Sequence, residues 1–183
     1  MEWILPGPVL QIPDKDAAHI QQVFSSLFLG GGIVLSQVSG ITGLEPYTVQ
    51  NWVKRGFLPA PEKKRYTLRQ LCRIININML KGVLPMERIC GLLTYINGHL
   101  DDVSDDIIDD SQLYFMFVEL AMQARELFDE NAREQALMQI LSAYEEPMPG
   151  AKERVAQVLR IMLTGYLAAR LQQQTEIMIK EIM

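Results

Sequence analysis

The sequence predicts a mostly α-helical protein, with a basic segment ahead of an acidic C-terminal part. Apolar residues recur at helical spacing along much of the chain, and glycine, proline or a capping residue marks the ends of these stretches. Residues 45–90 hold nine lysines and arginines against three glutamates, a charge of +6, which leaves −11 for the rest of a chain of net charge −5. Apolar residues make up 49% of the 183 residues, enough for a core without disulfides.

Residues 1–32 are expected to form an N-terminal arm and a helix. Three prolines between positions 6 and 13 favour an extended arm. The helix after it has Asp14 as its cap and ends at the glycine triplet 30–32. The triplet lacks a following Gly-Lys-Ser/Thr, so a turn is favoured over a phosphate-binding loop. The expected apolar face of the helix comprises Ala17, Ile20, Val23, Phe24, Leu27 and Phe28.

Two short helices joined by a glycine-containing turn follow, in the outline of a helix-turn-helix. The first is expected over about 37–42 and the second over 46–55, with Pro46 in its first turn. Helical periodicity places Val49, Trp52 and Val53 on the inner face of the second helix. The outer face carries groups that can contact phosphates and base edges: Tyr47, Gln50, Asn51, Lys54 and Arg55.

A basic segment, stiffened by prolines, comes next and suits a wing lying along a phosphate backbone. Its cations are the consecutive Lys63, Lys64 and Arg65 within residues 62–66. Thr67 and Gln70 predict a capping box for the following helix, which is expected to carry Arg69 and Arg73 on its outside. We expect Arg69 to add a phosphate contact. A solvated basic face with no ligand is the alternative interpretation of this charge.

Residues 33–98 resemble the head of MerR-type regulators. The string from Leu35 to Trp52 is similar to the helix-turn-helix of that family, Gly56-Phe57-Leu58-Pro59 and Arg65-Tyr66-Thr67 to its wing, and residues 81–89 to the helix pair behind the wing. The resemblance implies a MerR-like winged helix-turn-helix that binds double-stranded DNA.

The whole chain is similar to the uncharacterised bacterial group called domain of unknown function 1836, which shares this head, and the similarity implies a transcriptional regulator. Gln50 and Asn51 stand where MerR proteins usually have an arginine and an aromatic residue, so their operator sequences do not transfer. Cys72 and Cys90 both lie inside the matched head, which disfavours metal sensing through thiolates.

Six aspartates lie within residues 101–110 and begin the acidic part of the chain. They spell Asp-Asp-x-x-Asp twice, a pattern that holds magnesium in prenyl-transferring enzymes, but there on facing helices rather than in adjacent positions. The spacing also differs from that of a calcium loop. We expect an acidic junction leading into a helix, whose N-terminal end favours negative charge. A site for a cation or for a basic partner is the alternative.

Residues 99–183 are expected to form an acidic helical domain with helices at about 111–128, 131–144 and 151–183. The helix at 111–128 is apolar nearly all round, so it must be buried on more than one side. The three helices either close a bundle within one chain or complete their burial in a homodimer. Methionines in this part can fill gaps or accommodate an apolar effector, whose identity is unknown.

The predicted function is that of a dimeric bacterial transcription factor. Helix 46–55 would enter the major groove, the wing at 62–66 would contact phosphates, and the C-terminal helices would form the homodimer. A non-enzymatic module that binds an acidic protein partner through the same head is the alternative. Only two histidines are present, neither near a cysteine, so no enzymatic activity, metal or cofactor is expected. Because we find no secretory signal and no apolar run long enough to span a membrane, we expect a cytoplasmic protein.

Overall fold

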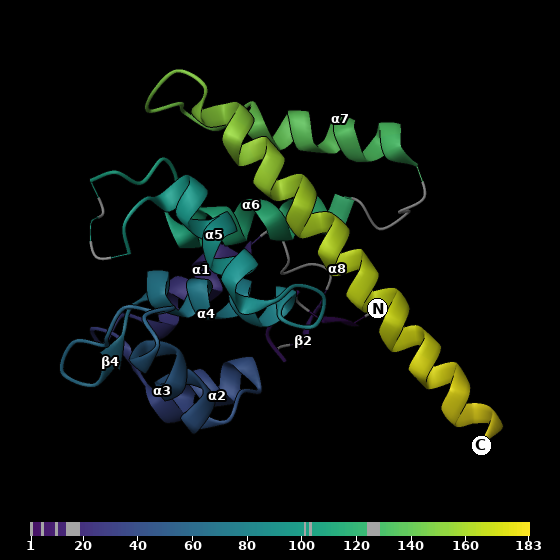
Figure 1. Cartoon of the computed structure of the whole chain (residues 1–183), viewed down its shortest axis with the longest axis horizontal. Helices are drawn as coiled ribbons and strands as arrows, with labels where there is room; N and C mark the ends of the chain where they lie inside the picture. Colours follow the sequence, from purple (N-terminus) through teal and green to yellow (C-terminus); the bar gives the residue numbers. More distant parts are fainter. Residues whose placement is uncertain are drawn as a thin grey trace.

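The computed structural model describes residues 2–4, 6–9, 11–13, 19–100, 102, 104–123 and 129–183. Within these residues the protein is mostly helical, as the sequence predicts, with two small antiparallel sheets (Figure 1). The helices are α1 (Ile20–Leu27), α2 (Leu35–Thr42), α3 (Pro46–Lys54), α4 (Leu68–Leu80), α5 (Met86–Asn97), α6 (Asp110–Gln123), α7 (Glu130–Leu141) and α8 (Ala151–Ile182). The strands are β1 (Glu2–Ile4) paired with β2 (Gln11–Pro13), and β3 (Ile33–Val34) paired with β4 (Arg65–Tyr66).

Local signals place most helix ends within a few residues. The predicted capping box of α4 is confirmed, because Gln70 N donates to Thr67 Oγ1 at 3.2 Å and Thr67 N donates to Gln70 Oε1 at 2.9 Å. α3 ends one residue before the predicted 55. α2 begins at Leu35 rather than near Gln37, because the Gln37 side chain reaches back to accept from Val34 N at 3.0 Å.

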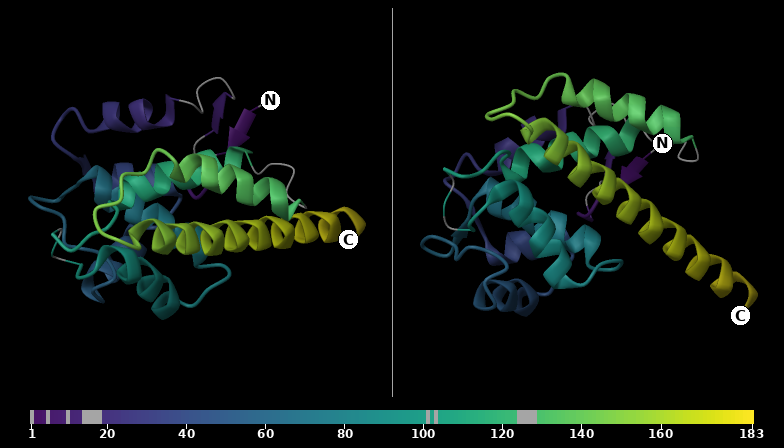
Figure 2. Two further views of the ribbon diagram at one scale, coloured as in Figure 1. Left: turned by 90° about the horizontal axis from the view of Figure 1, so that it is seen from above. Right: turned by 45° about the horizontal axis from the view of Figure 1, so that its top comes forward.

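α4 forms the centre of the molecule. Ten of its thirteen residues are buried, so this helix is covered on nearly every side. It packs against α6, and α8 crosses α4, α5 and α6 (Figure 2). Buried side chains from α1 to α8 belong to one hydrophobic core. The division of the chain at 32/33 and 98/99 stays a prediction, and the buried side chains of the three parts belong to one core.

The N-terminal arm is built into this core. Pro6 and Pro8 are buried, and Tyr114 Oη donates to the Pro6 carbonyl at 3.2 Å. Gly7 has φ +92, and a Cβ there would lie 2.6 Å from Ile75 Cγ2. The arm is extended as predicted, but its extended stretches pair as β1 and β2 instead of remaining single.

α1 is shorter than predicted and presents a narrower apolar face. Ile20 and Phe24 are buried, and the Phe24 ring packs at a tilt against Tyr114 and edge-to-face against Phe115 of α6, with ring centroids 5.8 Å apart in each pair. Val23 and Leu27 are exposed, contrary to the prediction, because only one side of this eight-residue helix meets the core. The predicted cap Asp14 and the predicted core residue Ala17 lie outside the described residues.

α8 consists of a buried half and a projecting half. Its buried residues end at Leu163, Tyr166 and Leu167 still pack partly buried against the core, and beyond them the helix projects from the rest of the molecule (Figure 1). In the projecting half, Leu171 is 53% exposed and Met178 is 60% exposed. The helices thus close a bundle only as far as the middle of α8. None of the helices in the described part of the chain combines the length and apolar composition that crossing a membrane requires.

Candidate nucleic-acid interface

α3 presents the polar face that its periodicity predicts. Val49 and Trp52 are buried, which fixes the helix on the body of the protein. The Lys81 ammonium lies 5.9 Å from the centre of the Trp52 ring and closes the inner side. The predicted contact residues of α3 are all exposed, namely Tyr47, Gln50, Asn51, Lys54 and Arg55.

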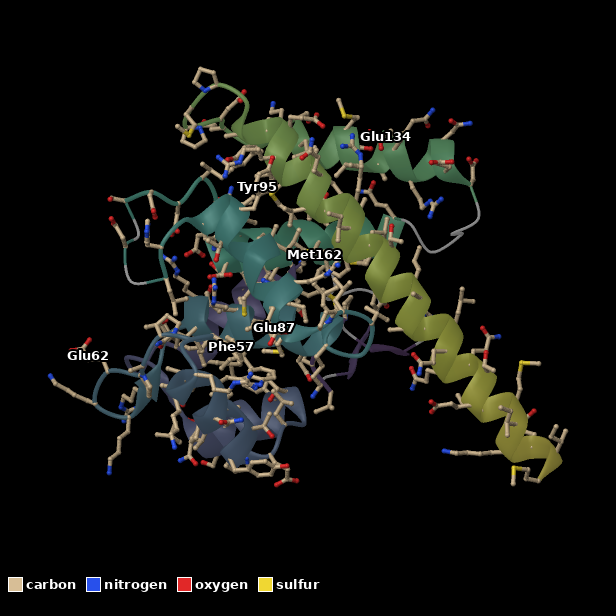
Figure 3. All side chains as sticks on the ribbon, in the orientation of Figure 1. Phe57, Glu62, Glu87, Tyr95, Glu134 and Met162 are labelled. Carbon is tan, nitrogen blue, oxygen red and sulfur yellow. The ribbon has the colours of Figure 1, made fainter. Side chains whose placement is uncertain are left out.

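Arg55 has partners of its own within the protein. Its guanidinium carbon lies 4.6 Å from the centre of the Phe57 ring, a cation–π distance. It also approaches Glu87 at 3.9 Å, but both side chains are largely exposed, so this ion pair contributes little. Figure 3 shows Phe57 and Glu87 close to the body of the molecule. The Arg55 charge is therefore held near the end of α3 while remaining accessible.

Residues 62–66, which we call the basic loop, have an unusual backbone. Arg65 N donates to the Glu62 carbonyl at 2.8 Å and closes a tight turn. The two residues between them, Lys63 at φ +47 and Lys64 at φ +64, are both left-handed. Such turns normally carry Asn-Gly or Asp-Gly, because other residues in this conformation cost roughly 1–2 kcal/mol each. The turn places two exposed ammonium groups at its tip, beside Glu62 at the outer edge of the molecule (Figure 3).

Arg65 anchors the basic loop to the preceding glycine-rich turn. Its Nη1 donates to the Gly32 carbonyl at 2.8 Å, and its backbone is paired with Val34 in the β3–β4 sheet. Gly32 has φ +107, and a Cβ there would lie 3.0 Å from the Tyr66 carbonyl oxygen. The last glycine of the triplet thus allows the close approach of β4. Arg65 contributes both to this junction and to the charge of the loop.

A groove of about 590 Å³ separates α3 from the basic loop. Gln50 reaches it from α3 and Lys64 from the basic loop, while Val53 and Tyr66 supply apolar lining. The two predicted contact elements therefore form one concave surface.

Arg69 lies elsewhere, in an ion cluster with the acidic segment. Its Nη2 is 2.6 Å from Asp106 Oδ2, and its Nε is 3.7 Å from carboxylate oxygens of Asp109 and Asp110. The Arg69 side chain is 22% exposed and that of Asp106 is 8% exposed. The structure therefore pairs Arg69 with these carboxylates, and its guanidinium is not left free as the predicted phosphate contact. Three of the aspartates expected at an acidic junction, Asp106, Asp109 and Asp110, contact arginines of α4 within the same chain.

Arg73 is buried, so the prediction that it lies on the outer face of α4 is wrong. Its Nη1 is 3.2 Å from Asp110 Oδ2, its Nε donates to the Phe57 carbonyl at 3.2 Å, and the two charged side chains are 5% and 1% exposed. A buried counter-charge explains how a buried arginine is tolerated. The sequence offers one signal that the two arginines belong to the same cluster, because Arg69 and Arg73 are four residues apart and so share a face of the helix.

Burial dominates the electrostatics of this cluster. Desolvation raises the pKa of Asp110, and the nearby Arg73 and Arg69 oppose that rise. Desolvation likewise raises the pKa of Asp106, with Arg69 opposing it. The second carboxylate oxygen of Asp106, Oδ1, is buried and has no hydrogen-bond partner among the described residues.

The described part of the chain offers few other candidate sites for binding a metal ion or a ligand. It holds no group of three His, Cys, Asp or Glu side chains placed to bind a metal ion. Cys72 is buried and Cys90 is half-buried, and both are free thiols. Between α1 and α6 lies a groove of about 490 Å³, lined in part by Met116 and Met122.

Comparison with known proteins defines a family without a known activity. Residues 16–117 match the model of a family described as a domain of unknown function (DUF1836), which is more than half of the chain. The chain is 29% identical over 86 residues to "Uncharacterized protein YkrK" of Bacillus subtilis (strain 168). That match covers 45% of this chain and only 37% of the relative, so the chain spans little more than a third of its length. No solved structure matches the chain. On the extent of the family match, the protein belongs to the DUF1836 family.

Proposed function

We propose that the protein is a DNA-binding transcriptional regulator whose α2, α3 and β3–β4 elements work as a winged helix-turn-helix of the MerR type. In this proposal α3 is the recognition helix and the basic loop is the wing. The short α2 is capped by Gly43, which is left-handed with φ +69, and α3 begins three residues after this glycine. This sequence of two short helices and a tight turn is what a helix-turn-helix requires.

The left-handed pair Lys63 and Lys64 is the observation that carries the proposal. Glycine or asparagine would satisfy this backbone at lower cost, yet the turn holds two lysines with exposed ammonium groups. Backbone strain of this kind persists at sites where it serves a function. A polyanion bound at the tip accounts for the choice of residues, because each lysine can then neutralise a phosphate.

The groove beside α3 supports DNA as that polyanion. Gln50 and Asn51 are exposed amides, and such side chains can pair with the edge of adenine in the major groove. Gln50 shares the groove with Lys64, so contacts to bases and contacts to phosphates would adjoin. Lys54 extends the positive surface along α3. Arg69 is left out of the proposed contacts in the free protein because Asp106 holds it.

We also propose that the projecting half of α8 pairs with that of a second copy. The projecting half of α8 exposes the apolar side chains of Leu171, Met178 and Ile182, which a second copy could cover. Residues 164–183 contain two basic and two acidic side chains, so two copies do not repel through net charge. Pairing would provide two recognition helices for two half-sites.

Fluorescence anisotropy tests the DNA proposal. The protein is titrated with a duplex from upstream of its own gene and with a scrambled duplex, over a series of salt concentrations. Lys63→Gln and Lys64→Gln should each weaken binding to both duplexes and lower the salt slope by ~0.9, because each removes the cation that neutralises one phosphate. Asn51→Ala should chiefly reduce the preference for the native duplex. Lys152→Gln, at the start of α8, is the matched control and should leave both affinities unchanged.

The outcome separates the proposal from its alternative. An absence of binding to either duplex at low salt would overturn the DNA proposal. Stoichiometric binding of an acidic protein through Lys63 and Lys64, without affinity for DNA, would establish an interaction module instead. These two lysines are better targets than Arg65, whose substitution would also break its hydrogen bond to Gly32.

A further inference from the structure

The acidic connection between α5 and α6 lies on the same side of the molecule as the basic loop. Figures 1 and 2 show this connection beside the β4 region in each view. The acidic connection contacts the residues that follow the basic loop through the 2.6 Å pair of Asp106 and Arg69. Arg69 stands in the first turn of α4, three residues after the basic loop ends. A carboxylate of the acidic connection thus holds the cation that follows the proposed wing.

Asp106 is the fixed member of this pair. Its neighbour Ile107 is buried, with Ile107 N donating to the Ile96 carbonyl at 2.9 Å. The Ile107 carbonyl accepts a hydrogen bond from Tyr144 Oη. These bonds tie the backbone at Asp106 to α5 and to the residues that follow α7. The long side chain of Arg69, which is partly exposed, is the member that can change partner.

The ion pair of Arg69 and Asp106 is held less firmly than the neighbouring pair of Arg73 and Asp110. Arg73 and Asp110 are both almost fully buried, so separating them would leave a charge in the core. Arg69 is within reach of solvent, and Asp106 keeps one buried oxygen without a partner among the described residues. Exchange of Asp106 for another oxyanion is therefore less costly at Arg69 than at Arg73.

We propose that Asp106 competes with a DNA phosphate for Arg69 and so limits the affinity of the protein for DNA. In the free protein the Asp106 carboxylate binds the Arg69 guanidinium. When DNA lies along the basic loop, a phosphate oxygen takes the place of the carboxylate, since both are oxyanions that the guanidinium can bind in the same way. The acidic connection thereby acts as an internal ligand of the DNA-binding surface. This inference rests on the proposed function.

Asp106→Asn tests the competition, with Asp102→Asn as its matched control. Asp102 belongs to the same acidic connection, but its carboxylate accepts hydrogen bonds from Ser104 and from no arginine among the described residues. In the Asp106→Asn variant the carboxylates of Asp109 and Asp110 still lie 3.7 Å from Arg69 Nε, so the expected gain in affinity is modest. We therefore expect Asp106→Asn to tighten DNA binding roughly three- to fivefold, and Asp102→Asn to change it far less.

Repeating the substitution in an Arg69→Gln background distinguishes competition from general repulsion. If Asp106 acts through Arg69, Asp106→Asn brings no gain once the guanidinium is absent. Equal gains from Asp102→Asn and Asp106→Asn, or a gain that persists with Arg69→Gln, would overturn the inference in favour of simple charge repulsion. An unchanged affinity of a folded Asp106→Asn protein would overturn it as well. Failure of the proposed function looks different, because the wild-type protein would then bind no duplex.

A spectroscopic measurement on the wild-type protein avoids reliance on any variant that folds poorly. The Nε–H resonance of Arg69, assigned by its loss in Arg69→Lys, should shift when DNA is added, because the guanidinium exchanges a carboxylate for a phosphate. The Arg73 resonance should stay in place, since its pair with Asp110 remains buried. An Arg69 resonance that does not move in the DNA complex would refute the exchange.

Discussion

The buried pair of Arg73 and Asp110 allows a quantitative test of how the acidic segment is joined to α4. Asp110→Asn preserves the shape of the side chain but leaves the Arg73 guanidinium in the core without its nearest counter-charge. Breaking one member of a buried pair typically costs about 3–5 kcal/mol. For a chain of this size each kcal/mol lowers the melting temperature by about 2–4 °C, so a fall of roughly 6–20 °C is expected.

Urea denaturation followed by circular dichroism measures this loss, and the slope with urea should stay near the wild-type value. Arg73→Met combined with Asp110→Leu removes both charges and keeps apolar volume in the site. This double variant should be more stable than Asp110→Asn, because no unpaired charge remains in the core. A loss below about 1 kcal/mol for Asp110→Asn would refute the argument, since a charge that costs so little to strand is effectively solvated.

Three further predictions concern the basic loop, the projecting helix and the α7–α8 contact. Lys64→Gly should raise the free energy of unfolding by roughly 0.5–1 kcal/mol, measured by urea denaturation, because glycine relieves the left-handed strain. The same variant should weaken DNA binding in anisotropy, and a lower free energy of unfolding would contradict the strain. Leu171→Glu with Met178→Glu should convert a dimer into a monomer in analytical ultracentrifugation, and a monomeric wild-type protein would contradict the pairing. Hydrogen bonds from Arg160 hold the pKa of Glu134 below its ordinary value of 4.5, so this pair stabilises the folded state above that pH and the contribution is lost as the pH falls through the lowered pKa. The stability difference between wild type and Glu134→Gln should accordingly shrink on acidification below pH 4.5, and a difference independent of pH would exclude the pair as its source.

Features that depend on neighbours in the sequence could be predicted. The Thr67–Gln70 capping box and the buried face of α3 follow from local hydrogen bonding and from helical periodicity. Features that depend on distant partners could not. Arg73 resembles a surface residue until Asp110, 37 positions away, is known to be its buried partner. The burial of Pro6 likewise depends on Tyr114, which lies on another helix.

The candidate interface shows the same limit. Exposure of Gln50 and Asn51 follows from the turn of a helix, so these residues could be identified from the sequence. The left-handed turn at Lys63 and Lys64 could not, because neither residue favours that backbone. Its conformation is set by closure of the turn between Glu62 and Arg65, which pair across it. The position of Arg69 in the helix suggests a phosphate contact. That position alone does not reveal the Asp106 carboxylate that binds its guanidinium.

The central position of α4 has a practical consequence for dissecting the protein. A fragment of residues 33–98, cut where the composition changes, would retain α4 but lose α6 and α8, which cover it. Buried residues such as Leu71, Ile74 and Leu80 belong to the same core as those two helices, so part of the apolar surface of these residues would become exposed to solvent. Such a fragment should be poorly soluble, even though it contains every residue of the proposed DNA-binding surface. A protein used for binding studies should therefore retain α6 and the buried half of α8, which complete the core that supports α3 and the basic loop.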